Sequence, residues 1–193
     1  MPKVFTTSST MVMTTTWFTL LVILLGKVLL MNDFKQFVNS SFCSGQMSGM
    51  VGRKIQQLSY GKIILPRIVA LDPAGLLFEE SADAISKSDA VNVQIIHSNG
   101  GRMGMQRQAG TIDFYPNGGT SSPGCHSTVA PDMMSIVKDS PCDHNRSWQI
   151  YQWAVRYPKA FPAVRCNSWD DFLNNGTCFR DEITYVGLGA NLK

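Results

Sequence analysis

Two nearly continuous apolar runs constrain the fold of this chain more than any other feature. Residues 63–71 contain Ile, Leu and Val with few interruptions, and residues 90–97 repeat the pattern. Short continuous runs of this kind are typical of strands that are buried on both faces of a parallel sheet. Pro66 is expected to mark the start of the first strand. With a helix predicted over residues 46–57, the order of elements indicates an α/β architecture with a mostly parallel sheet.

Polar residues end both predicted strands. Asp72 follows the first strand and His97 ends the second. In open α/β sheets the functional residues collect beyond the carboxyl ends of the strands. His144 stands just before a second predicted helix, over residues 146–156. Strand-end aspartates are often turn formers and single histidines are often surface groups, so these positions alone do not pair Asp72 with His144.

Small and capping residues predict how the two helices are placed. Gly49 and Gly52 would let the first helix approach a strand closely. Asp143 and Asn145 are expected to cap the start of the second helix. After Gly110 the chain is expected to be rich in loops.

The composition indicates one globular domain and excludes several classes of function. The chain has 193 residues, of which 44% are hydrophobic and 16% are charged. Its net charge of +3 is spread along the chain, so a nucleic-acid-binding surface is not indicated. A phosphate-binding glycine loop and zinc-type Cys/His spacing are also missing from the sequence.

The five cysteines indicate an oxidising compartment. Four of them form two close pairs, Cys125 with Cys142 and Cys166 with Cys178, which suggests two small disulfide loops. Cys43 is left over and is expected to be a buried apolar thiol rather than a reactive one. Glycosylation sequons give weak further support for a secreted glycoprotein; they stand at Asn39, Asn145 and Asn175.

Residues 1–39 are predicted to be a signal-like or hydrophobic N-terminal segment. The apolar run over residues 17–25 has the length of a signal-peptide core and is too short to span a bilayer, so no integral membrane span is expected. The alternative is a hydrophobic helix of the fold over residues 20–37, because Leu, Val and Met recur there at helical spacing.

Five motifs in order identify a family resemblance. They are RIVALDPAG at residues 67–75, IIHSNGG at 95–101, DFYPNGG at 113–119 followed by PGC at 123–125, CDHNRS at 142–147, and CNSWDDF at 166–172 closed by Cys178. Together they resemble the animal pancreatic-type lipase family, which includes phospholipases A1 and the insect yolk-protein branch. The resemblance covers about residues 45–185.

The resemblance implies a partial α/β-hydrolase fold over residues 40–193. The family has several strands before its nucleophile, and the 39 residues before Ser40 resemble none of them. The domain is therefore expected to be truncated at its N-terminus, with a sheet that lacks its early strands. A fragment, a splice product and an imperfect gene model remain alternative explanations.

The resemblance also assigns catalytic positions. The family uses a Ser-Asp-His triad, whose acid corresponds to Asp72 and whose base corresponds to His144; the Asp would orient the imidazole, which would take the serine proton. The family's elbow reads GHSLGGQ, and counting back without a gap from residues 48–54 places Phe42 at the nucleophile position. Phenylalanine has no nucleophilic atom. Ser41 and Ser44 lie nearby, but a shift of one or two residues would misaim either of them.

Two further features of the family concern calcium and lipid. Asp89 matches a carboxylate of the family's calcium sites, but Ser86 stands where another would be, so no metal is predicted, and no cofactor. The segment between Cys125 and Cys142 corresponds to the family's lid. Its apolar residues could form a face toward lipid, or the segment could be a solvated disulfide loop; they are Val129, Met133, Met134, Ile136 and Val137.

The sequence thus predicts a secreted lipase homologue of lipid metabolism that is inactive on esters because Phe42 replaces the nucleophile. Its expected partner is lipid or a lipid–water interface, and the sequence does not set an oligomeric state. The alternative is a non-catalytic, yolk-protein-like protein that binds lipid or a partner. Two further alternatives are an active lipase or phospholipase A1 using Ser41 or Ser44, and an unstable product without function.

Overall fold

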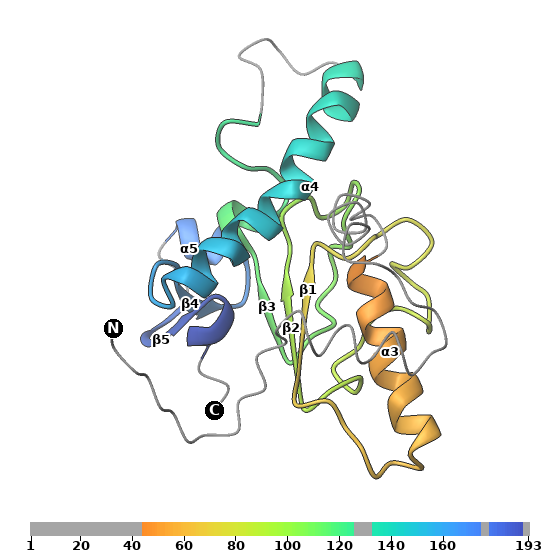
Figure 1. Cartoon of the computed structure of the whole chain (residues 1–193). Helices are drawn as coiled ribbons and strands as arrows, with labels where there is room; N and C mark the ends of the chain where they lie inside the picture. Colours follow the sequence, from red (N-terminus) through yellow and green to blue (C-terminus); the bar gives the residue numbers. More distant parts are fainter. Residues whose placement is uncertain (1–43, 126–132, 175–177, 191–193) are drawn as a thin grey trace, which may run out of the picture. The chain divides into compact units, whose positions relative to one another are not determined.

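The computed structural model describes residues 44–125, 133–174 and 178–190 (Figure 1). These described residues all belong to one compact unit, Ser41–Lys193. The predicted N-terminal segment, residues 1–39, lies outside them. So do Phe42, Cys43 and residues 126–132 of the segment at the lid position.

A three-stranded parallel sheet forms the centre of the unit. Its strands are β1 (Arg67–Leu71), β2 (Asn92–Ile96) and β3 (Ile112–Phe114), in the order β1-β2-β3. Both pairs are parallel, with Leu71 opposite Ile96 and Ile96 opposite Phe114. The parallel α/β architecture is therefore confirmed. Pro66 directly precedes β1, as predicted.

Each face of the sheet packs against one long helix (Figure 1). On one face, Ile68 and Ala70 of β1 join a buried apolar cluster that lies beside α3 (Ser44–Leu58). A Cβ atom on Gly52 would lie 2.9 Å from the Ile68 side chain and still closer to the Asp89 carbonyl oxygen, so the absence of a side chain is what allows α3 to approach β1. On the other face, Val69 and Leu71 pack with residues of α4 (Met133–Arg156).

The second helix begins earlier than the sequence suggested. α4 starts at Met133, so Asp143, His144 and Asn145 lie inside the helix, and the expectation that Asp143 and Asn145 cap it is wrong. Pro141 lies inside α4 as well. Proline fixes φ near the helical value and removes one backbone donor, so a helix can continue through it at a cost. Pro141, Asp143 and Asn145 are residue types that are common at helix starts, but here they lie inside α4.

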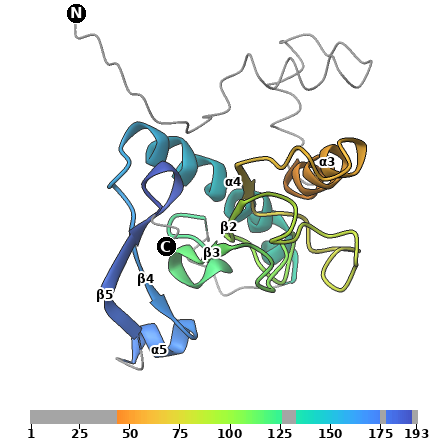
Figure 2. The same cartoon turned by 90° about the horizontal axis from the view of Figure 1, so that it is seen from below.

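The loop-rich region after Gly110 contains more regular structure than predicted. It includes β3, the 3-10 helices Pro116–Gly119 and Gly187–Gly189, and a two-stranded antiparallel sheet. That sheet pairs β4 (Pro162–Cys166) with β5 (Cys178–Tyr185) and flanks α5 (Trp169–Leu173). Figures 1 and 2 place the hairpin on the opposite side of the parallel sheet from α3.

Both predicted disulfides form. Cys125 joins Cys142, and Cys166 joins Cys178. The first connects the loop after β3 to α4, and the second closes the β4–β5 hairpin across α5. No helix in the described part of the chain is long and apolar enough to cross a membrane.

Candidate functional site

Asp72 lies directly after β1, at the carboxyl end of the sheet. Its backbone has a positive φ of 44°, a conformation that Asp adopts more readily than most residues. Its side chain is fully buried. One carboxylate oxygen, Oδ1, accepts hydrogen bonds from the backbone amides of Ser98 at 2.7 Å and Asn99 at 3.0 Å. The chain that leaves β2 therefore holds the carboxylate in one orientation.

The second carboxylate oxygen of Asp72 meets His144. The Asp72 Oδ2 atom lies 2.6 Å from His144 Nδ1, and the imidazole, carried by α4, is 3% exposed. A carboxylate can only accept a hydrogen bond, so Nδ1 carries the proton and Nε2 is the nitrogen that a neutral ring offers as a base. The structure thus joins two residues that are 72 positions apart in the sequence.

Gly104 packs directly against the Asp72 carboxylate. A Cβ atom on Gly104 would lie 2.6 Å from both Cγ and Oδ2 of Asp72, and still closer to Oδ1. Gly104 forms isolated backbone bridges with Ala74 and Gly100. Any side chain at position 104 would therefore force the carboxylate to move. Gly104 was not predicted as part of the site, because the sequence does not show which side chain packs against a glycine.

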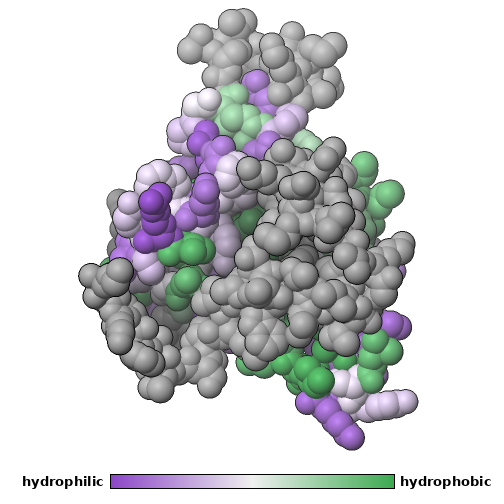
Figure 3. Space-filling model, in the orientation of Figure 1, coloured by the Kyte–Doolittle hydropathy of each residue, from purple (hydrophilic) through white to green (hydrophobic). Residues whose placement is uncertain are grey.

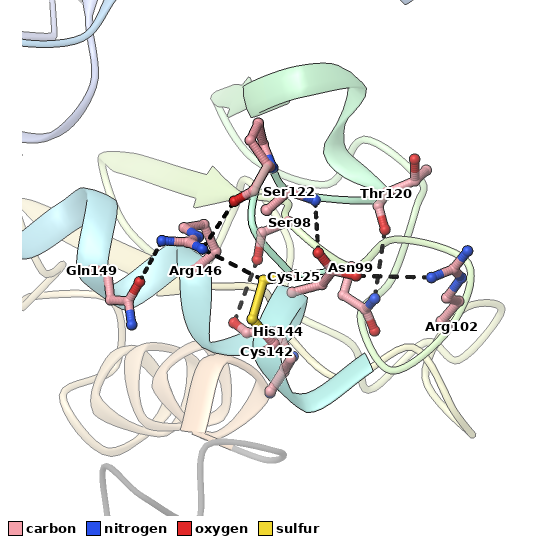
Figure 4. The surroundings of a disulfide bond; sticks show 12 residues. Ser98, Asn99, Arg102, Thr120, Ser122, Cys125, Cys142, His144, Arg146 and Gln149 are labelled. Atoms are coloured by element: carbon pink, nitrogen blue, oxygen red, sulfur yellow. Dashed lines mark hydrogen bonds and ion pairs between the residues drawn. A yellow bond between two sulfur atoms is a disulfide. The ribbon is translucent and has the colours of Figure 1, made fainter. Parts of the chain in front are cut away.

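The part of α4 that carries His144 is fastened on several sides (Figure 4). The neighbouring Asp143 accepts a hydrogen bond from the Ser122 amide at 2.6 Å and lies 3.8 Å from Arg102 Nη1. The Cys125–Cys142 disulfide ties the adjacent turn of α4 to the same loop. These links fix where the imidazole stands relative to Asp72.

The start of α3 is locked against the chain that follows Asp72. Gln46 is fully buried; its Nε2 donates to the Ala74 carbonyl at 2.7 Å, and its Oε1 accepts from the Ile85 amide at 2.8 Å. A Cβ atom on Gly45 would lie 2.7 Å from the Cβ of Pro73. The first residues of α3 therefore pack beside the acid of the site. Gln46 was not predicted as part of the site, because its partners Ala74 and Ile85 lie 28 and 39 positions away in the sequence.

His97, the other strand-end residue, belongs to a separate pair. Its Nε2 lies 2.8 Å from Asp113 Oδ1 and its Nδ1 lies 2.8 Å from the Met105 carbonyl oxygen. The Tyr115 ring stacks on the imidazole at 4.4 Å. Burial, and then the negative charges of Asp113 and Glu79, raise the pKa of the Tyr115 hydroxyl above its usual range. His97 thus ties β2 to β3 and lies outside the Asp72–His144 pair.

The residues at the family's calcium position do not fit a calcium ion. Asp89 is buried and forms an ion pair with Arg53, Nε to Oδ1, at 3.1 Å. Its other oxygen accepts from the Ser86 amide at 2.9 Å. A cation would have to displace the guanidinium group of Arg53. Within residues 44–125, 133–174 and 178–190, no group of three or more His, Cys, Asp or Glu residues stands ready to hold a metal.

The site's geometry agrees with the comparisons to known proteins. The family model described as Lipase matches residues 20–191. The chain belongs to the pancreatic-type lipase family. Its parallel sheet with helices on both faces is a partial α/β-hydrolase fold.

Three relatives illustrate the likeness. The chain is 40% identical to lipase member H of Oryctolagus cuniculus over 116 residues, which cover 59% of this chain and 25% of the relative. It is 34% identical to phospholipase A1 of Vespa crabro over 146 residues, 75% of this chain and 44% of the relative. It is 36% identical to human pancreatic lipase-related protein 3 over 131 residues, 60% of this chain and 28% of the relative. The chain thus spans less than half the length of these relatives.

Proposed function

We propose that this chain is a secreted lipase-family protein that binds lipid without hydrolysing its ester bonds. The observation that carries the proposal is Phe42, which stands at the nucleophile position when the family's elbow is counted back without a gap. The phenyl ring offers no atom that His144 can activate. Removal of the nucleophile costs on the order of 10⁶ in kcat in a well-measured protease.

The local structure supports this count. In the family's fold, the nucleophile stands on a sharp turn between a strand and a helix. Here α3 begins at Ser44, so Phe42 precedes the first helical residue by two positions. Gln46 and Gly45 lock this end of α3 against Ala74 and Pro73, which limits how far the helix can shift along its axis. A displaced nucleophile would require such a shift.

The buried Asp72–His144 pair fits the family's acid and base. Asp72 would hold the imidazole in the tautomer that leaves Nε2 as the base. In the absence of a serine at position 42, this pair has no nucleophile to activate. We propose that it acts as a structural link between β1 and α4, with its carboxylate satisfied by the amides of Ser98 and Asn99.

Covalent labelling tests whether any serine is activated. The purified chain would be incubated with a fluorescent alkylphosphonate, which reacts with activated serines, beside the variants Ser41→Ala, Ser44→Ala and His144→Ala. We expect no labelling of the folded wild-type chain. Labelling that disappears in His144→Ala and in one serine variant would show an esterase with a displaced nucleophile and would overturn the proposal.

The alternative is a non-catalytic, yolk-protein-like protein that binds lipid or a partner, and its partner-binding form would carry no lipid. Lipid extraction of the purified chain, followed by mass spectrometry, separates the two. We expect acyl lipids to be bound in stoichiometric amounts. A lipid-free chain that forms a defined complex with another protein would favour the alternative.

A further inference from the structure

An exposed apolar group lies where α3 turns into β1. Leu58 is 63% exposed, Tyr60 92%, Ile63 58% and Ile64 48%. We call these four residues the α3–β1 tip. Figure 3 shows hydrophobic side chains gathered at the lower right of the molecule, at the far end of α3, with hydrophilic side chains projecting beside them. Single exposed apolar residues are common on proteins, whereas a contiguous group at a projecting turn marks an interaction site.

The backbone holds the tip in this exposed arrangement. The Gly61 amide donates to the Gln56 carbonyl at 2.8 Å, and the Lys62 amide donates to the Ser59 carbonyl at 3.0 Å. The Ile63 amide donates to Ser59 Oγ at 3.0 Å. Positive φ angles at Tyr60 and Gly61, 51° and 76°, close the turn. The tip is thus a defined turn whose apolar side chains face solvent.

Charge distinguishes the tip from a second exposed apolar group, which lies on α5 and the β4–β5 hairpin. Residues 44–71 contain four basic residues and no Asp or Glu. Arg53 is paired with Asp89, whereas Lys62, between Tyr60 and Ile63, and Lys54, one helical turn before Leu58, are exposed. The other group, on α5 and the β4–β5 hairpin, is interspersed with acidic residues; its members include Trp169, Phe172, Phe179 and Ile183, beside Asp170, Asp171 and Glu182. Only the α3–β1 tip of these two groups combines exposed apolar side chains with unopposed positive charge.

We propose that the α3–β1 tip docks on an anionic lipid surface. Its aliphatic side chains would enter the boundary between head groups and acyl chains, and Tyr60 would lie at the head-group level. Lys54 and Lys62 would extend their stems along the apolar surface and place their ammonium groups against lipid phosphates. This combination gives two additive sources of membrane affinity, apolar burial and electrostatic attraction.

The tip is separate from the Asp72–His144 site. β1 lies between them, and five strand residues span about 17 Å. The tip precedes the amino end of β1, and Asp72 follows its carboxyl end. The proposed docking is therefore independent of whether the site hydrolyses an ester, and each proposal can fail without the other.

Vesicle co-sedimentation of the full chain tests the docking. The vesicles would contain phosphatidylcholine alone, or phosphatidylcholine with phosphatidylglycerol. We expect the wild-type chain to prefer the anionic vesicles and to be released by salt. Ile63→Ser should weaken partitioning about tenfold. Lys62→Gln should weaken it roughly fivefold on anionic vesicles and leave the weak binding to neutral vesicles unchanged.

Leu77→Ser is the matched control, because Leu77 is 87% exposed but lies beyond the carboxyl end of β1. We expect it to bind as the wild-type chain does. All three substitutions are at exposed positions, and a circular-dichroism melt of each variant confirms that it folds. Equal wild-type binding to both kinds of vesicle, unchanged binding of the Ile63→Ser and Lys62→Gln variants, or loss of binding in Leu77→Ser alone would overturn the proposal. So would a wild-type dimer in gel filtration that Ile63→Ser dissociates, since the tip would then be the contact between two copies of the chain.

Discussion

Replacing Gly104 with alanine tests how tightly the Asp72–His144 pair is confined. The new methyl group would lie 2.6 Å from Cγ and Oδ2 of Asp72, a separation that real Cβ atoms essentially never show. Because the carboxylate is fully buried, it has little room to retreat without losing hydrogen bonds to Ser98, Asn99 or His144. Each hydrogen bond to a charged group contributes about 1.5–3 kcal/mol.

We expect Gly104→Ala to break one or two of these hydrogen bonds and therefore to lower the free energy of unfolding by about 3–5 kcal/mol. For a chain of this size, that corresponds to a fall in Tm of roughly 10 °C. The measurement is urea unfolding followed by circular dichroism, with the melting temperature as a second readout. The NMR signals of the His144 ring should also move, because its carboxylate partner is displaced.

Gly61→Ala is the control. Gly61 has a φ of 76° and no atom within 4 Å of its added Cβ, so this substitution tests backbone strain without a steric clash. We expect it to cost about 1–2 kcal/mol. Gly104 does not share this strain, because its φ lies outside the left-handed region. If Gly104→Ala unfolds at the same urea concentration as the wild-type chain, the close packing against Asp72 described above is wrong.

Three further predictions concern the surroundings of the site. Gln46→Leu should lower the free energy of unfolding by about 2–4 kcal/mol, because it leaves the buried Ala74 carbonyl and Ile85 amide without their partner; urea unfolding beside the exposed Gln57→Leu control measures this. The pKa of Tyr115 is near 10 in the unfolded chain and is raised in the folded chain. Tyr115 therefore makes its full contribution to the free energy of unfolding below pH 10, and this contribution is lost as the pH rises above 10. Urea midpoints at about pH 9 and pH 11 should therefore differ less in Tyr115→Phe than in the wild-type chain. Replacing Cys125 and Cys142 together with alanine should cost about 3 kcal/mol, given their separation of 17 residues; an unchanged melting temperature would contradict this.

Strands β1 and β2 of the central sheet could be predicted from the sequence because most of their residues are apolar. Ile68 and Ala70 face α3 while Val69 and Leu71 face α4, so no polar position interrupts β1. Pro66 marked the strand's start correctly. By contrast, the apolar Ile63 and Ile64 belong to an exposed turn, because hydrophobicity alone does not separate a buried strand from a projecting apolar surface.

The elements that the sequence did not reveal are short or stabilised by distant contacts. β3 has three residues and pairs only with β2 among the described strands, so it has almost no periodicity of its own. The first half of α4 was missed because Asp143 and Asn145 are typical helix-capping residues, although both lie inside the helix. Tertiary contacts override local propensity in such segments.

The family motifs located the Asp72–His144 site in the sequence, and the packing around Asp72 explains why the two residues meet. Residue types alone gave no reason to join Asp72 to His144, and the family resemblance supplied it. The structure adds the physical cause, since the chain after β2, the glycine at position 104 and the fastened turn of α4 converge on one carboxylate. The identity of the residue at the nucleophile position remains a proposal from the sequence, because Phe42 lies outside the described residues.

The central claim is that Phe42 replaces the nucleophile beside an otherwise formed acid–base pair. The most direct test is the rate of p-nitrophenyl butyrate hydrolysis by the wild-type chain, by His144→Ala, by Phe42→Ser and by Phe42→Ser combined with His144→Ala. We predict that the wild-type chain does not exceed the uncatalysed rate, that Phe42→Ser does, and that the double variant loses the gain. Wild-type turnover that His144→Ala abolishes, or a Phe42→Ser variant that folds but gains nothing, would contradict the placement of Phe42 at the nucleophile position.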